Sequence, residues 1–159
     1  DNIFFGQSEA ADTDETLQQA LQLSQAAEFV DRYPEKAAHP IAQLGRNVSG
    51  GQKQRLSIAR ALARRPEILI FDDSFSALDY KTDATLREGL AKQLPGTTKI
   101  IVAQRISTIR HADQILVLDR GEIAGLGTHD ALMASCPVYR EIAMSQLSEE
   151  ELKKGGASK

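Results

Sequence analysis

The stretch Asn47-Val48-Ser49-Gly50-Gly51-Gln52-Lys53-Gln54-Arg55 places a hydroxyl and two residues without side chains at the expected start of a helix. The N–H groups of a helix's first turn have no acceptor within the helix, and the helix dipole adds positive charge at the same end. Glycines at this point let a phosphate come close to the backbone. The stretch therefore predicts an anion site, and we expect the anion to be the phosphate of a nucleotide.

A second pattern follows. The apolar run Glu67-Ile68-Leu69-Ile70-Phe71-Asp72-Asp73 ends in two carboxylates and is followed by Ser76-Ala77-Leu78-Asp79. Each piece alone is weak, because Ser-Gly-Gly occurs in ordinary turns and an apolar strand ending in aspartate is common in α/β proteins. In this order and at this spacing, the pieces resemble the ATP-binding cassette (ABC) ATPases. The resemblance makes Ser49–Gln52 the family signature, Ile68–Asp72 the Walker B strand and Ser76–Asp79 the D-loop.

The resemblance extends from Asp1 to about Leu147. The segment 1–6 resembles the one after the Q-loop in exporters, and the segment 121–132 resembles their C-terminal hairpin and helix. The implied fold is the α/β fold of P-loop NTPases. The implied parts are a helical subdomain at 1–47, the signature helix with the Walker B, D-loop and switch part of the RecA-like core at 48–147, and a flexible tail at 148–159.

The apolar pattern itself divides the chain into two regions. Helical spacing begins at Asp14 and Glu15 and continues through Val30, and prolines then end it in a loop. From Val48 onward helices and strands alternate, which favours a parallel sheet. The expected elements are a helix to about Arg64, a strand at 68–71, a helix around Leu86, Leu90 and Leu94, a strand at 99–103, a strand at 114–118 joined to Ile123 by a turn at 119–121, and helices starting near Thr128 and Pro137.

The composition excludes several classes of protein. The chain has 159 residues, of which 42% are hydrophobic and 26% charged, as expected for one soluble globular domain. A net charge of −3 without a basic stripe argues against nucleic-acid binding. No apolar run approaches the ~18 residues of a membrane span and no signal peptide opens the chain, so any membrane contact is expected to go through another domain.

The cysteine and histidine residues suggest no metal site. Cys136 is the only cysteine, so it cannot form an internal disulfide, and we interpret it as a small buried residue in a protein of a reducing compartment. His39, His111 and His129 have no nearby metal-ligating residues and are interpreted as exposed polar side chains.

One family motif is missing. The phosphate-cradling loop Gly-x-x-x-x-Gly-Lys-Ser/Thr needs a Gly-Lys pair, and the 159 residues contain none. In the family this loop and the Q-loop precede the segment that residues 1–6 resemble, so we interpret the chain as the larger, C-terminal part of a nucleotide-binding domain. The apolar strand at 68–71 is then expected to lack a sheet neighbour, and the chain to self-associate or to be marginally stable.

Two positions that the resemblance assigns to ATP hydrolysis depart from the family pattern. Asp72 matches the aspartate that holds Mg²⁺ through water. Asp73 stands where the family has glutamate, as the base or water-orienting group, and is one methylene shorter, whereas a base must lie within ~2.6–3.2 Å of the proton it takes. Gln104 stands in place of the switch histidine and cannot take up a proton. Each departure alone is compatible with a neutral change, and together they resemble the degenerate half of heterodimeric exporters.

The resemblance implies a role for each residue of the site. The expected cofactors are ATP and Mg²⁺. We expect contacts with the γ-phosphate of a partner domain's ATP from Ser49, Gly50, Gly51 and Gln52, with Mg²⁺ from Asp72, weakened catalysis at Asp73 and Gln104, and communication across the dimer through Asp79.

The expected protein is the ATPase subunit of a bacterial ABC exporter, at the cytoplasmic face of the cell membrane. Its expected partners are a second nucleotide-binding domain, in a heterodimer, and a transmembrane domain that Tyr33 and the segment Glu35–Gly45 face. The chain by itself is expected to be inactive. Two alternatives stay open: a soluble ABC ATPase of repair or translation, against which Asn2–Gly6 and Gly127–His129 argue, and a regulatory domain that binds ATP without turnover.

Overall fold

The computed structural model describes residues 2–5 and 13–146, and the chain divides into two compact units, Asp1–Val102 and Ala103–Lys159. Each unit is described by itself. Gly6 and the predicted tail at 148–159 lie outside the described residues.

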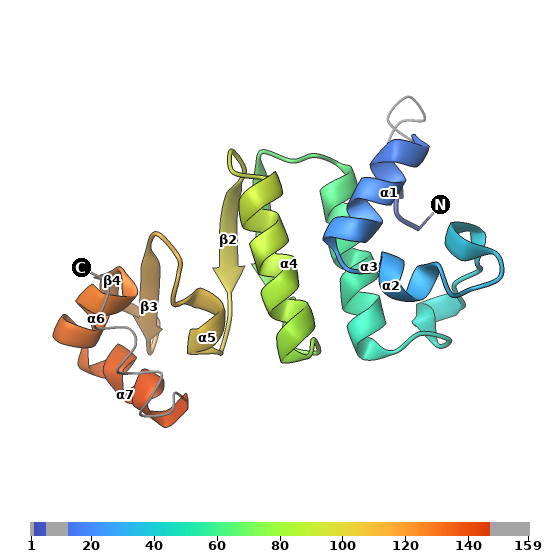
Figure 1. The fold of residues 1–159 in the computed structure, drawn as a ribbon. Helices are drawn as coiled ribbons and strands as arrows, with labels where there is room; N and C mark the ends of the chain where they lie inside the picture. Colours follow the sequence, from blue (N-terminus) through green and yellow to red (C-terminus); the bar gives the residue numbers. More distant parts are fainter. Residues whose placement is uncertain (1, 6–12, 147–159) are drawn as a thin grey trace. The chain divides into compact units, whose positions relative to one another are not determined.

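Helices and strands alternate as predicted from residue 48 onward (Figure 1). The first unit contains α1 (Asp14–Leu23), α2 (Ala27–Val30), the 3-10 helices η2 (Lys36–Ala38) and η3 (Gln43–Gly45), α3 (Gly50–Ala63), β1 (Ile68–Asp72), α4 (Tyr80–Gln93) and β2 (Thr98–Val102). The second contains α5 (Ile106–Ile109), β3 (Ile115–Asp119), β4 (Glu122–Gly127), α6 (His129–Ser135) and α7 (Pro137–Gln146).

The prediction of one helix that continues through Val30 is wrong in one respect. The helix breaks after Leu23, and a second helix begins at Ala27. Gln25 adopts a left-handed backbone with φ of +61°. The hydroxyl of Ser24 donates to the carbonyl of Leu21 at 3.1 Å and so helps to close the last turn of α1. Helical spacing in the sequence continues across this break because α1 and α2 both bury apolar residues in the same core.

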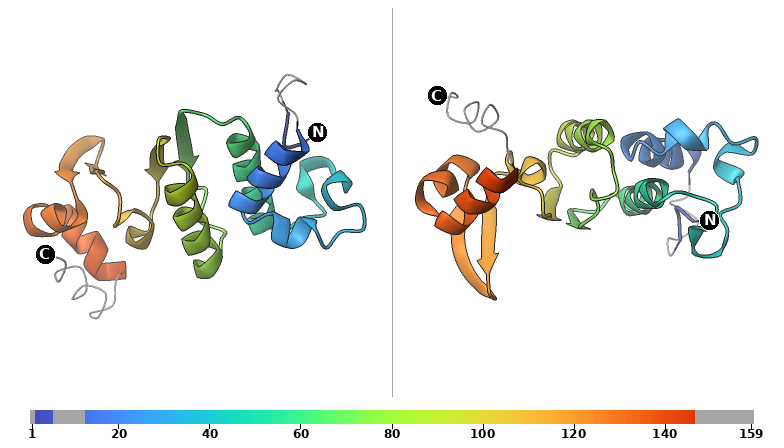
Figure 2. Two further views of the ribbon diagram at one scale, coloured as in Figure 1. Left: turned by 45° about the horizontal axis from the view of Figure 1, so that its top comes forward. Right: turned by 90° about the horizontal axis from the view of Figure 1, so that it is seen from below.

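Strands β1 and β2 form the parallel pair that the alternation predicts. Ile68 lies opposite Thr98 and Asp72 opposite Val102, and the turned views in Figure 2 show the two strands side by side. Helix α4 connects them, as parallel strands require a crossover. The carboxyl end of β1 therefore carries Asp72 and Asp73 at the edge of the sheet where ligands commonly bind in open α/β sheets.

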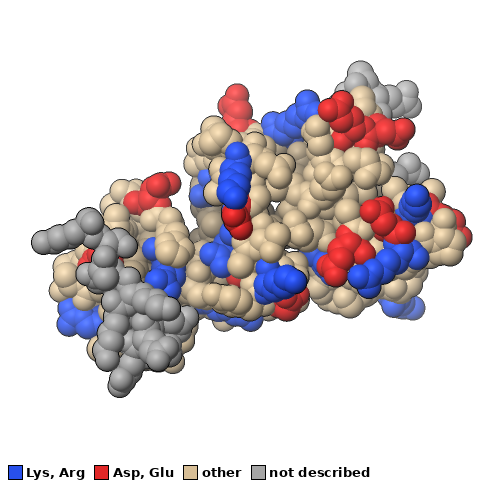
Figure 3. Space-filling model, viewed as in Figure 1, with Lys and Arg blue, Asp and Glu red and all other residues tan. Residues whose placement is uncertain are grey.

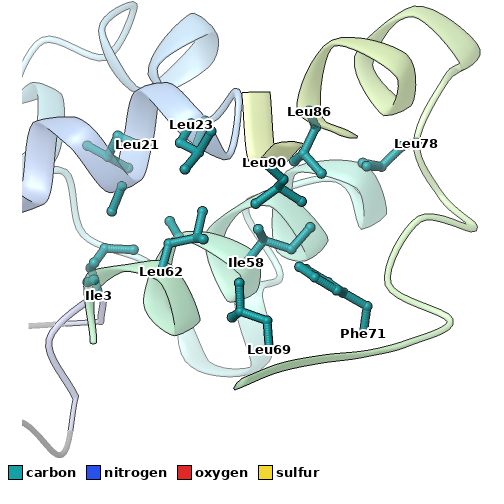
Figure 4. Packing of buried hydrophobic residues seen from close by; sticks show 14 of the residues in the cluster. Ile3, Leu21, Leu23, Ile58, Leu62, Leu69, Phe71, Leu78, Leu86 and Leu90 are labelled. Carbon is teal, nitrogen blue, oxygen red and sulfur yellow. The ribbon is translucent and has the colours of Figure 1, made fainter. Parts of the chain in front are cut away.

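One face of this sheet packs on helices α3 and α4. Leu69 and Phe71 are 3% and 2% exposed, and Figure 4 shows them with the leucines and isoleucines of the surrounding helices. Full burial of one such side chain stabilises the fold by about 1.5–3 kcal/mol. The cluster labelled in Figure 4 includes Ile3, Leu21, Leu23, Ile58, Leu62, Leu78, Leu86 and Leu90.

The opposite face of the same sheet is apolar and exposed. Ile68 and Ile70 of β1 are 57% and 68% exposed, and Ile100 and Val102 of β2 lie on the same face at 49% and 54%. Among the described residues β1 pairs with β2 alone, so both strands of the pair also carry an edge. This is the open sheet that the sequence predicts.

The second unit is a hairpin covered by two helices. Strands β3 and β4 are antiparallel, and the turn at Arg120 and Gly121 has φ of +49° and +84°, the positive values that a tight hairpin turn needs. Helices α6 and α7 lie on one face of this hairpin (Figure 2). Their core consists of Ile106, Ile115, Val117, Leu132, Cys136, Tyr139 and Ala143, which confirms the burial predicted for Cys136.

Some charged side chains on the helices form ion pairs with a residue one turn away. Figure 3 shows basic side chains lying beside acidic ones. On α4, Lys92 Nζ lies 2.6 Å from Glu88 Oε1, an exposed pair that solvent screens and that contributes little to stability. Asp83, which is only 3% exposed, receives two hydrogen bonds from Arg87 at 2.8 and 3.2 Å. The buried carboxylate is thus a structural pair of α4.

Candidate functional site

The signature begins α3 with a capping box. Ser49 Oγ accepts the N–H of Gln52 at 3.2 Å, and Gln52 Oε1 accepts the N–H of Ser49 at 2.8 Å. Because Ser49 Oγ acts as the acceptor here, its own hydrogen remains able to donate beyond the helix end. Ser49 and Gly50 are exposed. The helix start therefore has an exposed hydroxyl and an exposed glycine at the positive end of the helix dipole, which is chemistry that suits a phosphate.

The two glycines of the signature differ in the space that surrounds them. A Cβ on Gly50 would have only the Cβ of Ala77 near it, at 3.9 Å, so a side chain there meets open space. A Cβ on Gly51 would lie 2.9 Å from the backbone oxygen of Ala77, closer than real Cβ atoms come. Gly51 is thus needed for the close packing of α3 against the loop after β1. The sequence predicts only a phosphate role for it and misses this contact.

The end of β1 presents two exposed carboxylates. The N–H of Asp73 donates to the carbonyl of Val102 at 3.1 Å and so extends the sheet by one residue. Asp73 itself has φ of +47°, a left-handed conformation that aspartate tolerates better than most residues. Within residues 2–5 and 13–146 neither Asp72 nor Asp73 makes a side-chain hydrogen bond. Both carboxylates are therefore open to a ligand.

A complete metal cage is not present in the described part of the chain, where no group of three His, Cys, Asp or Glu residues could hold a metal ion. Mg²⁺ is usually bound by one or two carboxylates together with waters and substrate phosphates. The carboxylate of Asp72 is exposed and fits that mode of binding.

Asp79 has a structural role in addition to the predicted one. It is the N-cap of α4, where Oδ1 accepts the N–H of Thr82 at 3.0 Å and Oδ2 accepts the hydroxyl of Thr82 at 2.6 Å. The side-chain hydrogen bond from Thr82, and next the backbone one, lower the pKa of Asp79 below its ordinary value. Asp79 is therefore ionised at neutral pH and held in one orientation at the end of the D-loop.

Gln104 lies in the second unit, between β2 and α5, with an exposed side chain. Its backbone is held by the last residue of α7: Gln146 Nε2 donates to the carbonyl of Gln104 at 2.8 Å, and Gln146 Oε1 accepts the N–H of Ile106 at 2.9 Å. Sequence reasoning misses Gln146, because the contact joins residues 42 positions apart. The Gln104 side chain makes no hydrogen bond within the described residues.

The segment expected to face a transmembrane domain borders a pocket. A cavity of about 470 Å³ opens between the start of the chain and the loops after α2, and Tyr33, His39 and Leu56 help to line it. The rings of Tyr33 and His39 stack at 3.9 Å, and His39 Nδ1 lies 2.9 Å from Glu35 Oε2. The hydrogen bond from His39 lowers the pKa of Glu35. His39 is therefore half-buried and partnered, which corrects its interpretation as an exposed residue.

His129 is also more than an exposed polar residue. Its Nδ1 lies 2.8 Å from the hydroxyl of Tyr139, which is buried in the core of the second unit. Partial burial lowers the pKa of His129, and burial raises the pKa of Tyr139. His111 is exposed as predicted.

These features define a class: an α/β P-loop NTPase fold in which a glycine-containing helix start and a strand ending in carboxylates lie together. Comparison with known proteins identifies the family within this class. The family described as ABC transporter matches residues 3–76. The chain belongs to the ATP-binding domains of ABC transporters.

Individual relatives agree with this. The chain is 44% identical over 133 residues to a putative ABC transporter ATP-binding protein of Mycoplasma pneumoniae, covering 84% of this chain and 21% of the relative. It is 46% identical to an uncharacterized ABC transporter ATP-binding protein of Mycobacterium tuberculosis, covering 92% and 25%. It is 38% identical to an ATP-dependent lipid A-core flippase of Xanthomonas oryzae, covering 95% and 26%. The chain thus spans about a fifth to a quarter of the length of these relatives.

A solved structure gives the same result. The structure of a bacterial Atm1-family ABC exporter with ATP bound superimposes with a TM-score of 0.87 at 35% sequence identity, covering 93% of this chain and 26% of that chain. The described fold is accordingly that of the corresponding part of an exporter's nucleotide-binding domain. No helix among the described residues has the length and apolar character needed to span a bilayer.

Proposed function

We propose that this chain is part of the ATPase subunit of a bacterial ABC exporter, in which it supplies the signature to an ATP site completed by a second nucleotide-binding domain. The observation that carries the proposal is the start of α3, where Ser49 and Gly50 are exposed and the Ser49 hydroxyl, an acceptor for the N–H of Gln52, keeps its own hydrogen to donate. A phosphate needs donors that are already oriented, and the capping box orients these. The similarity to a lipid A-core flippase and to an Atm1-family exporter supports the proposal that the chain is part of an exporter.

The remaining residues take roles in the site that this chain's own strand would form. Asp72 would hold Mg²⁺, which would supply positive charge beside the phosphates of a bound ATP. Asp73 orients the attacking water weakly, because its carboxylate is one methylene shorter than the family's glutamate and a misplacement of ~1 Å can cost ~100-fold. Gln104 can donate to a phosphate but cannot carry a proton. Asp79, ionised and held by Thr82, faces the partner domain and carries the communication between sites.

The protein then acts as the non-catalytic half of a heterodimer. Asp73 and Gln104 weaken hydrolysis at the site formed by this chain's own strand. The intact signature of this chain completes the site of the partner. In this proposal the pocket beside Tyr33 and His39 is part of the surface that meets the transmembrane domain, at the cytoplasmic face of the cell membrane.

The test compares two alanine substitutions in the assembled heterodimer. Ser49→Ala removes a phosphate donor and should lower the ATP turnover rate about 100-fold, since a donor of this kind contributes ~3 kcal/mol. Asp73→Ala should lower turnover less than threefold. Ser49→Ala also removes a helix cap, so Thr13→Ala, which removes the cap of α1, is the matched control and should leave turnover unchanged.

Comparable losses from Ser49→Ala and Asp73→Ala would show that both sites hydrolyse ATP and would overturn the asymmetric pairing. Tight ATP binding by the wild-type heterodimer without any turnover would favour the regulatory alternative instead.

A further inference from the structure

One glutamine of α3 connects the signature helix to the loop after β1. Gln54 lies one turn beyond the helix start. Its Nε2 donates to the carbonyl of Asp73 at 3.4 Å and to Ser76 Oγ at 3.2 Å, and its Oε1 accepts the N–H of Ala77 at 3.1 Å. A single side chain thus contacts the loop at its beginning, middle and end.

The amide of glutamine supplies both kinds of group that this set of bonds needs. The carbonyl of Asp73 can only accept and the N–H of Ala77 can only donate, so the side chain that bridges them must carry both a donor and an acceptor. Asparagine is one methylene shorter, ionised glutamate has no donor, and methionine has no donor and only a weakly accepting sulfur. The two backbone partners also fix which end of the Gln54 amide is nitrogen and which is oxygen.

The contact acts on the two features that matter in the proposed function. Gln54 bonds the carbonyl of Asp73, the residue with φ of +47°, and so helps to hold its left-handed backbone. Beside this bond, Gly51 packs so closely on Ala77 that a Cβ would lie 2.9 Å from its carbonyl oxygen. In the same loop, Phe75 and Leu78 are buried in the core.

We propose that Gln54 is a positioning residue that makes the signature and the D-loop of this chain move as one body. A phosphate contact at Ser49 is then transmitted through the first turns of α3 to the backbone of residues 73–77. This rests on the function proposed above, because it assumes that Ser49 contacts a nucleotide. Gln54 itself touches no nucleotide in this scheme and acts through the loop.

The test uses two substitutions in the assembled transporter, Gln54→Met and Gln54→Glu, both close to glutamine in length. Two quantities are measured: amide hydrogen exchange in a peptide spanning residues 74–78, and kcat and KM for ATP. Gln54→Met should raise exchange at Ala77 about tenfold, the effect of one lost hydrogen bond. It should lower kcat about tenfold and change KM less than twofold, as expected for a contact that matters in the transition state.

Gln54→Glu separates the two ends of the amide. Its carboxylate still accepts the N–H of Ala77, so exchange there should stay within twofold of the wild type. It cannot donate to Asp73 or Ser76, so kcat should still fall. A purely structural role would lower the free energy of unfolding without separating exchange from kcat in this way. Gln18→Ala, at an exposed glutamine of α1, is the control and should change neither quantity.

The inference is overturned if Gln54→Met leaves exchange at Ala77 unchanged, or raises exchange and leaves kcat unchanged. Measuring Ser49→Ala in parallel distinguishes failure of the positioning role of Gln54 from failure of the proposed function. If Ser49→Ala lowers turnover about 100-fold and Gln54→Met does not lower kcat, only the positioning role of Gln54 is wrong. If Ser49→Ala also has no effect, the proposed function is wrong.

Discussion

The start of α3 and the end of β1 lie next to each other in the first unit, but the fold constrains their side chains very differently. The Ser49 and Gln52 side chains bond each other's backbone, and Gly51 is fixed by the carbonyl of Ala77. The Asp73 carboxylate makes no hydrogen bond within the described residues. A change at Ser49, Gln52 or Gly51 is therefore expected to damage folding and function together. At Asp73 the carboxylate is unconstrained but the backbone is left-handed, with φ of +47°, so aspartate in place of the family's glutamate bears on the local fold as well as on function.

The largest expected effect concerns nucleotide binding by the isolated 159-residue chain. It contains the helix start but no Gly-Lys pair, so few donors remain to replace water around a triphosphate. We expect calorimetry with Mg-ATP to give a Kd weaker than about 1 mM, corresponding to less than about 4 kcal/mol of binding free energy. Micromolar binding would mean that the start of α3 binds nucleotide without a partner domain. It would contradict the proposal that the signature acts only by completing the site of another domain.

The next prediction separates the two glycines of the signature. Gly51→Ala forces a Cβ against the backbone oxygen of Ala77 and should lower the free energy of unfolding by about 1–3 kcal/mol, the usual cost of overpacking. Gly50→Ala places its Cβ in open space and should change it by less than about 0.5 kcal/mol. Urea unfolding of both variants gives the comparison. Equal costs would show that α3 and the loop are not packed as described.

A third prediction restores the missing groups at the unconstrained positions. Asp73→Glu together with Gln104→His should raise hydrolysis at this chain's own site at least tenfold, since a positioned general base contributes about 10²–10⁴-fold. Either change alone should do little if the two groups act as a unit. Trapping of labelled nucleotide in the heterodimer is the measurement. Release of ATP from both sites at one rate, before and after the double substitution, would mean that the two departures are neutral.

The smallest expected effect is a pH dependence in the second unit. Burial lowers the pKa of His129, with contributions of the same sign from Arg110 and His111, and Asp130 opposes them. Because the folded state favours the neutral ring, the unfolded state binds more protons below the ordinary pKa of 6.5. The stabilisation by neutral His129 is present above that pH and is lost as the pH falls through the folded-state pKa.

Urea midpoints measured at pH 7.5 and 5.5 test this prediction. The wild-type chain should lose more stability between the two values than His129→Gln does, and His111→Gln, which removes one of the smaller causes of the lowered pKa, should lie between the two. Parallel losses in all three proteins would exclude a contribution from His129.

The fold could be predicted from the sequence where its signals are local. The apolar strand at 68–71, the alternation with helices and the polar turn before Gly121 each have a short-range cause, and the structure confirms all three. The break at Gln25 could not be predicted, because a left-handed glutamine has no sequence signal and the apolar period continues beyond it.

The candidate site was predictable as a set of motifs and not as a set of contacts. The sequence indicates that Gly51 matters, but its collision partner lies 26 residues away and is a backbone atom. Gln54 and Gln146 likewise act through partners 19 to 23 and 40 to 42 residues distant. Glutamines on helices are read as surface residues by any local rule, and only the packing of distant segments gives these two a role.

The exposed row formed by Ile68, Ile70, Ile100 and Val102 has a consequence for solubility. The two strands pair with each other, so the row is one continuous apolar surface on the open face of the sheet. Contiguous exposed apolar surface is typical of an interaction site or of an aggregation-prone region. While the row stays uncovered, the fold is therefore expected to associate through this face.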